Sequence, residues 1–161
     1  VGHNLSGKIM ICAASRFPNM VDTLLLVDAV GPEQDKVLRE AGRIVASDSF
    51  IWRWPIFFER RKKAEQRLKG LIGEHDYAMA RLMHAAFEKL VNYDSLAAAR
   101  LSQKPAALIW GAKDYPAHLK DARRYHKVFK TSHARTLKGV GHLDAGVRPD
   151  EFARALLNVL E

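Results

Sequence analysis

The sequence contains a single cysteine, Cys12, and lacks a long apolar run. One cysteine excludes an intrachain disulfide and argues against a thiolate metal site, so nothing favours an oxidising compartment and we expect a cytoplasmic protein. The longest apolar stretch lies around residues 24–27, far short of the roughly 20 residues that cross a bilayer. No leader with a basic and then an apolar part is recognisable. The sequence therefore predicts a globular protein without a membrane span or a signal peptide.

The composition is that of one ordinary globular domain, with an excess of positive charge. The 161 residues are 48% hydrophobic, and the formal net charge is +8 with a pI near 9.8. Much of the excess lies in the run Arg60-Arg61-Lys62-Lys63, within a segment of helical pattern. A polyanion site would use such a patch, but no nucleic-acid-binding motif accompanies it. We interpret the run as a solvated helix face and expect no nucleic-acid partner.

Hydrophobic patterns predict an α/β protein with a parallel sheet. Continuous apolar runs at 23–27 and 106–110 are typical of strands that are covered on both faces, and 134–137 is a shorter third strand. Between and after them lie helical patterns at 5–17, 117–129 and 149–160. Strands that alternate with helices favour parallel pairing with right-handed crossovers.

The segment from residue 33 to residue 104 interrupts this alternation. It contains no convincing strand but several helical patterns, of which the clearest places six apolar residues at helical spacing between Met79 and Leu90. We therefore expect a core made of residues 1–32 and 105–161, with residues 33–104 inserted as a helical cap.

The first residues have the spacing of a nucleophile elbow, which is a sharp strand-to-helix turn that presents one side chain at the top of a sheet. In Gly2-His3-Asn4-Leu5-Ser6 the small residues stand two before and two after the central position, but the central residue is an asparagine. An asparagine has neither a hydroxyl nor a carboxylate with which to attack a substrate. Taken alone, Asn4 is also a good helix-capping residue, so both interpretations stay open.

Two later motifs supply an acid and a histidine in the chain order that follows such an elbow. The segment 109–114 ends a strand at Asp114, and Gly139-Val140-Gly141-His142 lies between a strand and the last helix. A histidine in a loop often makes only a structural hydrogen bond. Asp28, at the end of the first apolar strand, is an alternative acid. We expect the carboxylate of Asp114 to lie about 3 Å from the imidazole of His142.

Together these three motifs resemble the α/β-hydrolase family, in the part that runs from the nucleophile elbow to the last helix. The resemblance implies a three-stranded parallel remnant of the family's sheet, with Asn4 in the nucleophile position, Asp114 as the acid and His142 as the general base. It also implies that the backbone N–H of Leu5 is an oxyanion donor. Family members have about five strands before the elbow, so we expect this chain to be the C-terminal part of a longer protein, with residues 23–27 as an unpaired edge open to self-association.

The segment Val-Asp-Ala-Val-Gly-Pro at 27–32, followed by a helical cap, resembles the lid-bearing esterases, lipases and carbon–carbon hydrolases of this family. We expect an apolar ester-like ligand and neither a metal nor a cofactor. The candidate pocket residues are His3, Trp52, Trp54 and Phe57, although aromatic residues of this kind also form ordinary cores.

Three functions follow from this pattern. The first is hydrolysis of an ester or a similar carbonyl compound, here impaired by Asn4 and by the absent strands. The second is a non-catalytic protein that holds a small molecule. The third is direct activation of water or substrate by Asp114 and His142. The fold does not decide among them.

Overall fold

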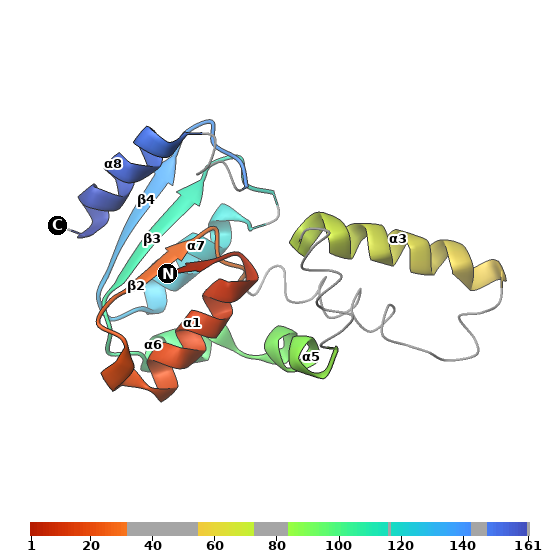
Figure 1. The fold of residues 1–161 in the computed structure, drawn as a ribbon, viewed down its shortest axis with the longest axis horizontal. Helices are drawn as coiled ribbons and strands as arrows, with labels where there is room; N and C mark the ends of the chain where they lie inside the picture. Colours follow the sequence, from red (N-terminus) through yellow and green to blue (C-terminus); the bar gives the residue numbers. More distant parts are fainter. Residues whose placement is uncertain (32–54, 73–83, 116, 143–147, 161) are drawn as a thin grey trace. The chain divides into compact units, whose positions relative to one another are not determined.

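The computed structural model describes residues 1–31, 55–72, 84–115, 117–142 and 148–160 (Figure 1). The chain divides into two compact units. One unit joins Val1–Glu33 to Asp94–Glu161 and contains the sheet, and the other is Gln34–Tyr93. Residues 94–104, which include helix α6 (Ser95–Leu101), therefore belong to the unit with the sheet. The cap role of residues 33–104 stays a prediction.

The sheet has four parallel strands in the order β1-β2-β3-β4 (Figure 1). Their bounds are Gly2–His3, Leu24–Val27, Ala106–Gly111 and Ser132–Leu137. Every residue of β2 and β3 is buried, as expected for central strands with both faces covered. In β4 only Leu137 is buried, which suits an edge strand. Because all strands run the same way, the loops that follow them meet at one edge of the sheet.

The short strand β1 corrects one prediction. β1 pairs with β2 through Gly2 opposite Leu26 and His3 opposite Val27. The expectation that residues 23–27 form an unpaired edge of a three-stranded sheet is therefore wrong, because β1 occupies that side. The association of copies through a sheet edge stays a prediction.

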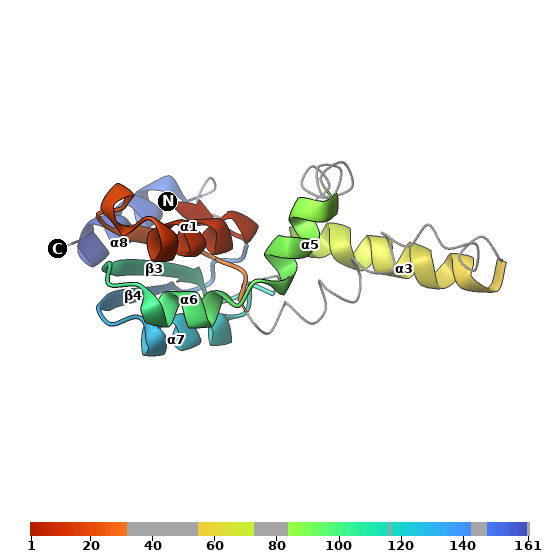
Figure 2. The same cartoon turned by 90° about the horizontal axis from the view of Figure 1, so that it is seen from below.

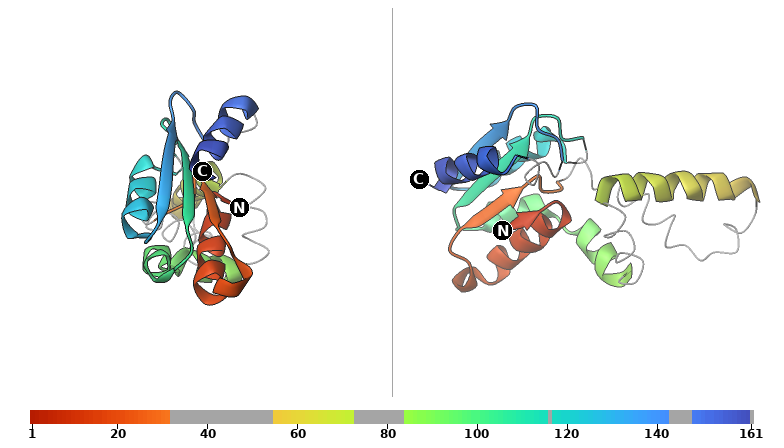
Figure 3. Two further views of the ribbon diagram at one scale, coloured as in Figure 1. Left: turned by 90° about the vertical axis from the view of Figure 1, so that its left-hand side faces the viewer. Right: turned by 45° about the horizontal axis from the view of Figure 1, so that its top comes forward.

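Helices cover both faces of the sheet (Figures 2 and 3). Helix α1 (Leu5–Arg16) packs against α6, and α6 packs against α7 (Leu119–Val128), so these three helices lie on one face of the sheet. Helix α8 (Pro149–Leu160) lies on the other face. A short 3-10 turn, η1 (Pro18–Met20), follows α1, since a proline has no N–H with which to continue the α-helix. The proline at the first position of α8 has a fixed φ that suits a helix start.

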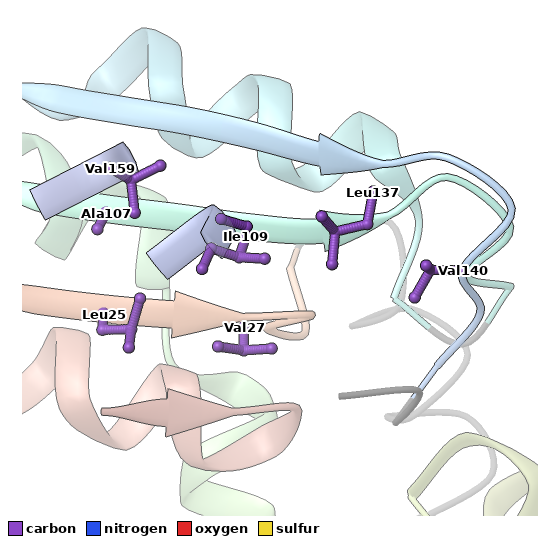
Figure 4. Close-up of a cluster of buried hydrophobic side chains, with 8 residues drawn as sticks. Leu25, Val27, Ala107, Ile109, Leu137, Val140 and Val159 are labelled. Atoms are coloured by element: carbon purple, nitrogen blue, oxygen red, sulfur yellow. The ribbon is translucent and has the colours of Figure 1, made fainter. Parts of the chain in front are cut away.

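One apolar cluster fills the space between the sheet and α8 (Figure 4). Alternate residues of β2 and β3 point into it, because successive side chains of a strand face opposite sides. Its buried members are Leu25, Val27, Ala107, Ile109, Leu137, Val140, Ala155 and Val159. The cluster extends to Val140 in the loop after β4, so it also anchors the segment that carries His142.

In the second unit the structure describes α3 (Pro55–Ile72) and α5 (His84–Asn92). The basic residues Arg60, Lys62 and Lys63 on α3 are exposed, whereas Ala64 is buried. This agrees with a solvated face. Most of the apolar pattern from Met79 onward lies outside the described residues. None of the helices in the part of the chain that the structure describes combines the length and the hydrophobicity needed to cross a membrane.

Candidate active site

The turn from β1 into α1 holds Asn4 in a strained conformation at the top of the sheet. Its φ of 50° and ψ of −124° lie in a region that residues with a side chain rarely adopt. Close packing enforces this turn, since a Cβ at Gly2 would lie 2.7 Å from Cα of Gly7, and one at Gly7 would lie 2.4 Å from Cβ of Ala29. The sequence pattern had assigned the small position to Ser6. That residue is exposed, and the contact belongs to Gly7.

Backbone hydrogen bonds tie the Asn4 peptide to the end of β2 and the start of α1. The Asn4 N–H donates to the carbonyl of Val27 at 3.2 Å. The Asn4 carbonyl accepts from the N–H groups of Gly7 and Val30, at 3.1 and 3.0 Å. The Ser6 hydroxyl donates to the backbone carbonyl of His3 at 2.7 Å and accepts from the His3 N–H at 2.9 Å. The turn is therefore fixed by its own backbone and by the strand beside it.

The side chain of Asn4 does not cap the helix, although Asn4 stands at the N-cap position of α1. It makes no capping hydrogen bond, and the residue is only 6% exposed. Its Oδ1 is buried and has no hydrogen-bond partner among the described residues. A capping asparagine would have satisfied a helix N–H, so the capping interpretation is wrong.

Asp114 and His142 form a hydrogen-bonded pair. His142 Nδ1 lies 2.7 Å from Oδ2 of Asp114, which is the contact expected from the sequence. The other carboxylate oxygen, Oδ1, accepts from the backbone N–H of Ala117 at 2.7 Å. The Asp114 side chain is fully buried and that of His142 is 12% exposed. His142 Nε2 is buried and has no hydrogen-bond partner in the described part of the chain.

The two loops that carry this pair are locked together. The N–H groups of Ala112 and Lys113 donate to the carbonyls of Leu137 and Val140, at 2.9 and 2.8 Å. At Gly111 an added Cβ would lie 2.7 Å from the carbonyl oxygen of Val140, so only glycine lets the loop after β4 cross here. The relative position of Asp114 and His142 is therefore fixed by backbone contacts.

Asp28 is a second buried carboxyl, close to that of Asp114. The sequence offers it as the alternative acid. Asp28 follows β2, has a φ of 45° and is 4% exposed. Its Oδ1 accepts from the N–H of Gly111 at 2.9 Å. Burial, the charge of Asp114 and a hydrogen bond between the two carboxyl groups together raise the pKa of Asp28 to about 7, against the lowering effect of the Gly111 hydrogen bond. This carboxyl therefore keeps its proton to a higher pH than an ordinary aspartate does.

His3 contributes a second imidazole. Its ring centroid lies 5.1 Å from that of His142, with the planes tilted by 38°. Among the described residues, donor atoms of His3, Asp28 and His142 all lie within 4.8 Å of one another, a set that a divalent cation could use. The expectation of a site without a metal stays a prediction.

The remaining candidate residues are brought into the site only in part. Leu5 is the first residue of α1, so its N–H has no acceptor within the helix. Trp52 and Trp54 lie outside the described residues. Phe57 lies in α3, in the other unit, and its side chain is also outside the described part. The aromatic pocket stays a prediction.

Comparison with known proteins identifies the fold. No protein-family model and no curated protein matches this sequence. Solved structures share the fold of this chain. A hydrolase from Pseudomonas aeruginosa PA01 has a TM-score of 0.65 at 19% identity over 99% of this chain and 63% of its own. The enol-lactonase from Burkholderia xenovorans LB400 has a TM-score of 0.64 at 18% identity, over 99% of this chain and 64% of its own.

A third structure is MGS-MChE2, an alpha/beta hydrolase enzyme from the metagenome of sediments of the lagoon of Mar Chica, Morocco. It has a TM-score of 0.63 at 16% identity and is covered over 57% of its length, against 98% of this chain. This chain therefore spans about three fifths of the length of these neighbours. The similarity extends over 98–99% of this chain. The chain has the α/β-hydrolase fold.

Proposed function

We propose that this chain provides the elbow, the acid and the histidine of an ester-hydrolase site, and that Asn4 blocks its covalent step. The observation that carries the proposal is the 2.7 Å hydrogen bond between His142 Nδ1 and Asp114 Oδ2, in a chain that also has the strained turn at Asn4. A carboxylate on Nδ1 fixes the imidazole tautomer and leaves Nε2 as the proton acceptor. The structural neighbours, which include a lactonase, favour an ester or a similar carbonyl compound as substrate.

Each residue has a defined part in the proposed chemistry. A hydroxyl at position 4 would give its proton to His142 Nε2 while its oxygen attacks the carbonyl carbon. The Leu5 N–H would donate to the oxygen that becomes negative. His142 would then return the proton to the leaving group. The amide of Asn4 cannot complete the first step, so no acyl-enzyme forms and the activity is impaired.

The test is acylation by an activated ester such as p-nitrophenyl acetate. The unmodified chain should give no burst of p-nitrophenol. Asn4→Ser should give one, and the double variant Asn4→Ser/His142→Ala should lose it. Removal of one oxyanion donor costs about 10²–10³ in rate. Rapid steady turnover should therefore require a preceding segment that supplies a second donor.

The proposal fails on either of two results. One is a His142-dependent burst from the unmodified chain. The other is an Asn4→Ser variant that is folded by circular dichroism and yet gains no acetyl group at residue 4 by mass spectrometry after long incubation. Asn19→Ser is the matched control, because it makes the same change at an exposed position.

A second candidate function is a non-catalytic small-molecule-binding protein. It is favoured by Oδ1 of Asn4 and Nε2 of His142, two buried polar atoms without hydrogen-bond partners among the described residues. Both atoms are acceptors when Asp114 holds the proton on Nδ1, and the two N–H groups of a ligand primary amide could satisfy both. Calorimetric binding of acetamide that is lost in Asn4→Ala, without activity in Asn4→Ser, would favour this function over the first.

A further inference from the structure

We propose that Asn4 is a modification site, where the folded elbow converts the side-chain amide to a carboxylate through an imide with the backbone nitrogen of Leu5. The proposal goes beyond the function above and does not depend on it. Three features of the elbow carry it: the torsion of the Asn4 backbone, the hydrogen bonds to the Asn4 carbonyl, and the unsatisfied side chain.

The backbone torsion places the attacking nitrogen beside the side chain. When an L-residue is viewed along its Cα–C bond, Cβ is rotated by about −120° from the backbone nitrogen. The torsion angle from Cβ to the next nitrogen is therefore ψ plus about 120°. At a ψ of −124° the nitrogen of Leu5 is thus nearly eclipsed with Cβ of Asn4, as a five-membered imide ring requires. Helical residues, with ψ about −42°, and parallel-strand residues, with ψ about +115°, hold the next nitrogen far from this position. At Asn4 the backbone needs no change, and a rotation of the side chain is enough to bring Cγ to the Leu5 nitrogen.

Hydrogen bonds make the Leu5 N–H more acidic. When this N–H loses its proton, much of the negative charge moves to the carbonyl oxygen of Asn4, which belongs to the same peptide. That oxygen accepts two hydrogen bonds, from Gly7 at 3.1 Å and from Val30 at 3.0 Å. The positive end of α1 also favours a negative charge at its first turn. The elbow therefore stabilises the amide anion that attacks.

No capping hydrogen bond restrains the side chain that is attacked. Asn4 Oδ1 has no partner among the described residues, and the amide makes no capping contact with α1. Asn4 is 6% exposed, but ring closure needs no external reagent, so burial does not prevent it. Water enters only in the second step.

The two steps balance as follows. The Leu5 nitrogen forms a bond to Cγ of Asn4, the bond from Cγ to Nδ2 breaks, and ammonia leaves with the proton of the Leu5 N–H. Water then adds to one imide carbonyl and the ring nitrogen regains a proton. Attack at Cγ gives aspartate, and attack at the backbone carbonyl gives isoaspartate. An aspartate here would carry a carboxylate nucleophile, which the amide lacks.

The experiment follows residue 4 by mass. The purified folded chain is incubated at neutral pH in water that is labelled with heavy oxygen, and is then digested with trypsin under mildly acidic conditions. The peptide of residues 1–8 should gain one labelled oxygen in place of its amide nitrogen, as a mixture of aspartate and isoaspartate. Hydroxylamine, which opens imides, should intercept the reaction and leave a hydroxamate at residue 4.

Two matched controls separate the elbow from ordinary deamidation. Asn158 is exposed and lies inside α8, so it has greater access to water but helical geometry. A synthetic peptide of residues 1–8 has the same sequence without the fold. The folded chain should convert Asn4 at least about tenfold faster than either control, because the strained torsion is already in place.

Equal or slower conversion of Asn4 in the folded chain, relative to the peptide, would overturn the proposal. So would conversion to aspartate that hydroxylamine does not intercept, because water would then attack the amide directly. Neither result bears on the acylation of Asn4→Ser, so failure of this inference is distinguishable from failure of the proposed function.

Discussion

The buried carboxyl of Asp28 makes the stability of the sheet-bearing unit depend on pH. Burial and the neighbouring charge of Asp114 raise its pKa from 3.8 to about 7. Between these values the folded protein keeps a proton that the unfolded chain has released, so the free energy of unfolding falls as the pH rises and levels off above about 7. At about 1.4 kcal/mol per pKa unit, the full loss is on the order of 4 kcal/mol.

Asp28→Asn should remove this dependence. In the parent, Oδ1 of Asp28 accepts from the N–H of Gly111 at 2.9 Å. The oxygen of the asparagine side chain can accept the same hydrogen bond, and the amide carries no charge. We expect the variant to match the parent at pH 4 and to exceed it at pH 8 by up to about 4 kcal/mol. Urea titrations followed by hydrogen exchange of the β3 amides report the opening of this unit.

Asp22→Asn is the matched control, since it removes the same charge from an exposed residue. It should leave the pH dependence unchanged. The reasoning about Asp28 would be refuted if Asp28→Asn gained no stability at pH 8, or gained the same amount at pH 4 and pH 8.

Two further substitutions test packing around the site. Tyr125→Phe removes a hydroxyl that donates to the carbonyl of Val30 at 2.9 Å and lies 2.7 Å from the hydroxyl of Ser95. It should destabilise the protein by about 1–3 kcal/mol in urea titrations, and an unchanged midpoint would contradict the buried hydrogen bonds. Gly7→Ala places a Cβ 2.4 Å from Cβ of Ala29 and should cost about 1–3 kcal/mol, with partial recovery in Gly7→Ala/Ala29→Gly. Additive effects in that double variant would argue against the contact.

The central strands could be predicted from the sequence because burial on both faces leaves a continuous apolar run. This holds for β2 and β3, whose observed bounds differ from the expected ones by a single residue. The strand β1 was not predictable from its own two residues, since so short a strand has no pattern. Its pairing depends on Leu26 and Val27, which lie far along the chain. β4 begins at Ser132, ahead of the expected residue 134, because its exposed start carries no apolar signal.

Residues of the candidate site could be predicted where a recognisable motif directly follows a predicted strand. Asp114 and His142 were found in this way, and their hydrogen bond is present. The involvement of Asp28 depends on β2 and β3 ending side by side, which places it against Gly111 and Asp114. Asn and Asp adopt a positive φ more often than other residues with a side chain, but packing around the turns decides that Asn4 and Asp28 do so here.

Strands β2 and β3 pair directly, although the separate compact unit Gln34–Tyr93 lies between them in the sequence. The entropy of closing such a loop grows only with the logarithm of its length, so doubling the insertion costs about 0.6 kcal/mol. Evolution can therefore lengthen, shorten or replace this unit at little thermodynamic penalty to the sheet. Asp28 and Asp114 lie on either side of the insertion in the sequence, and their carboxyl groups are close enough to interact. The chemistry at the strand ends can be inherited unchanged while the inserted unit diverges.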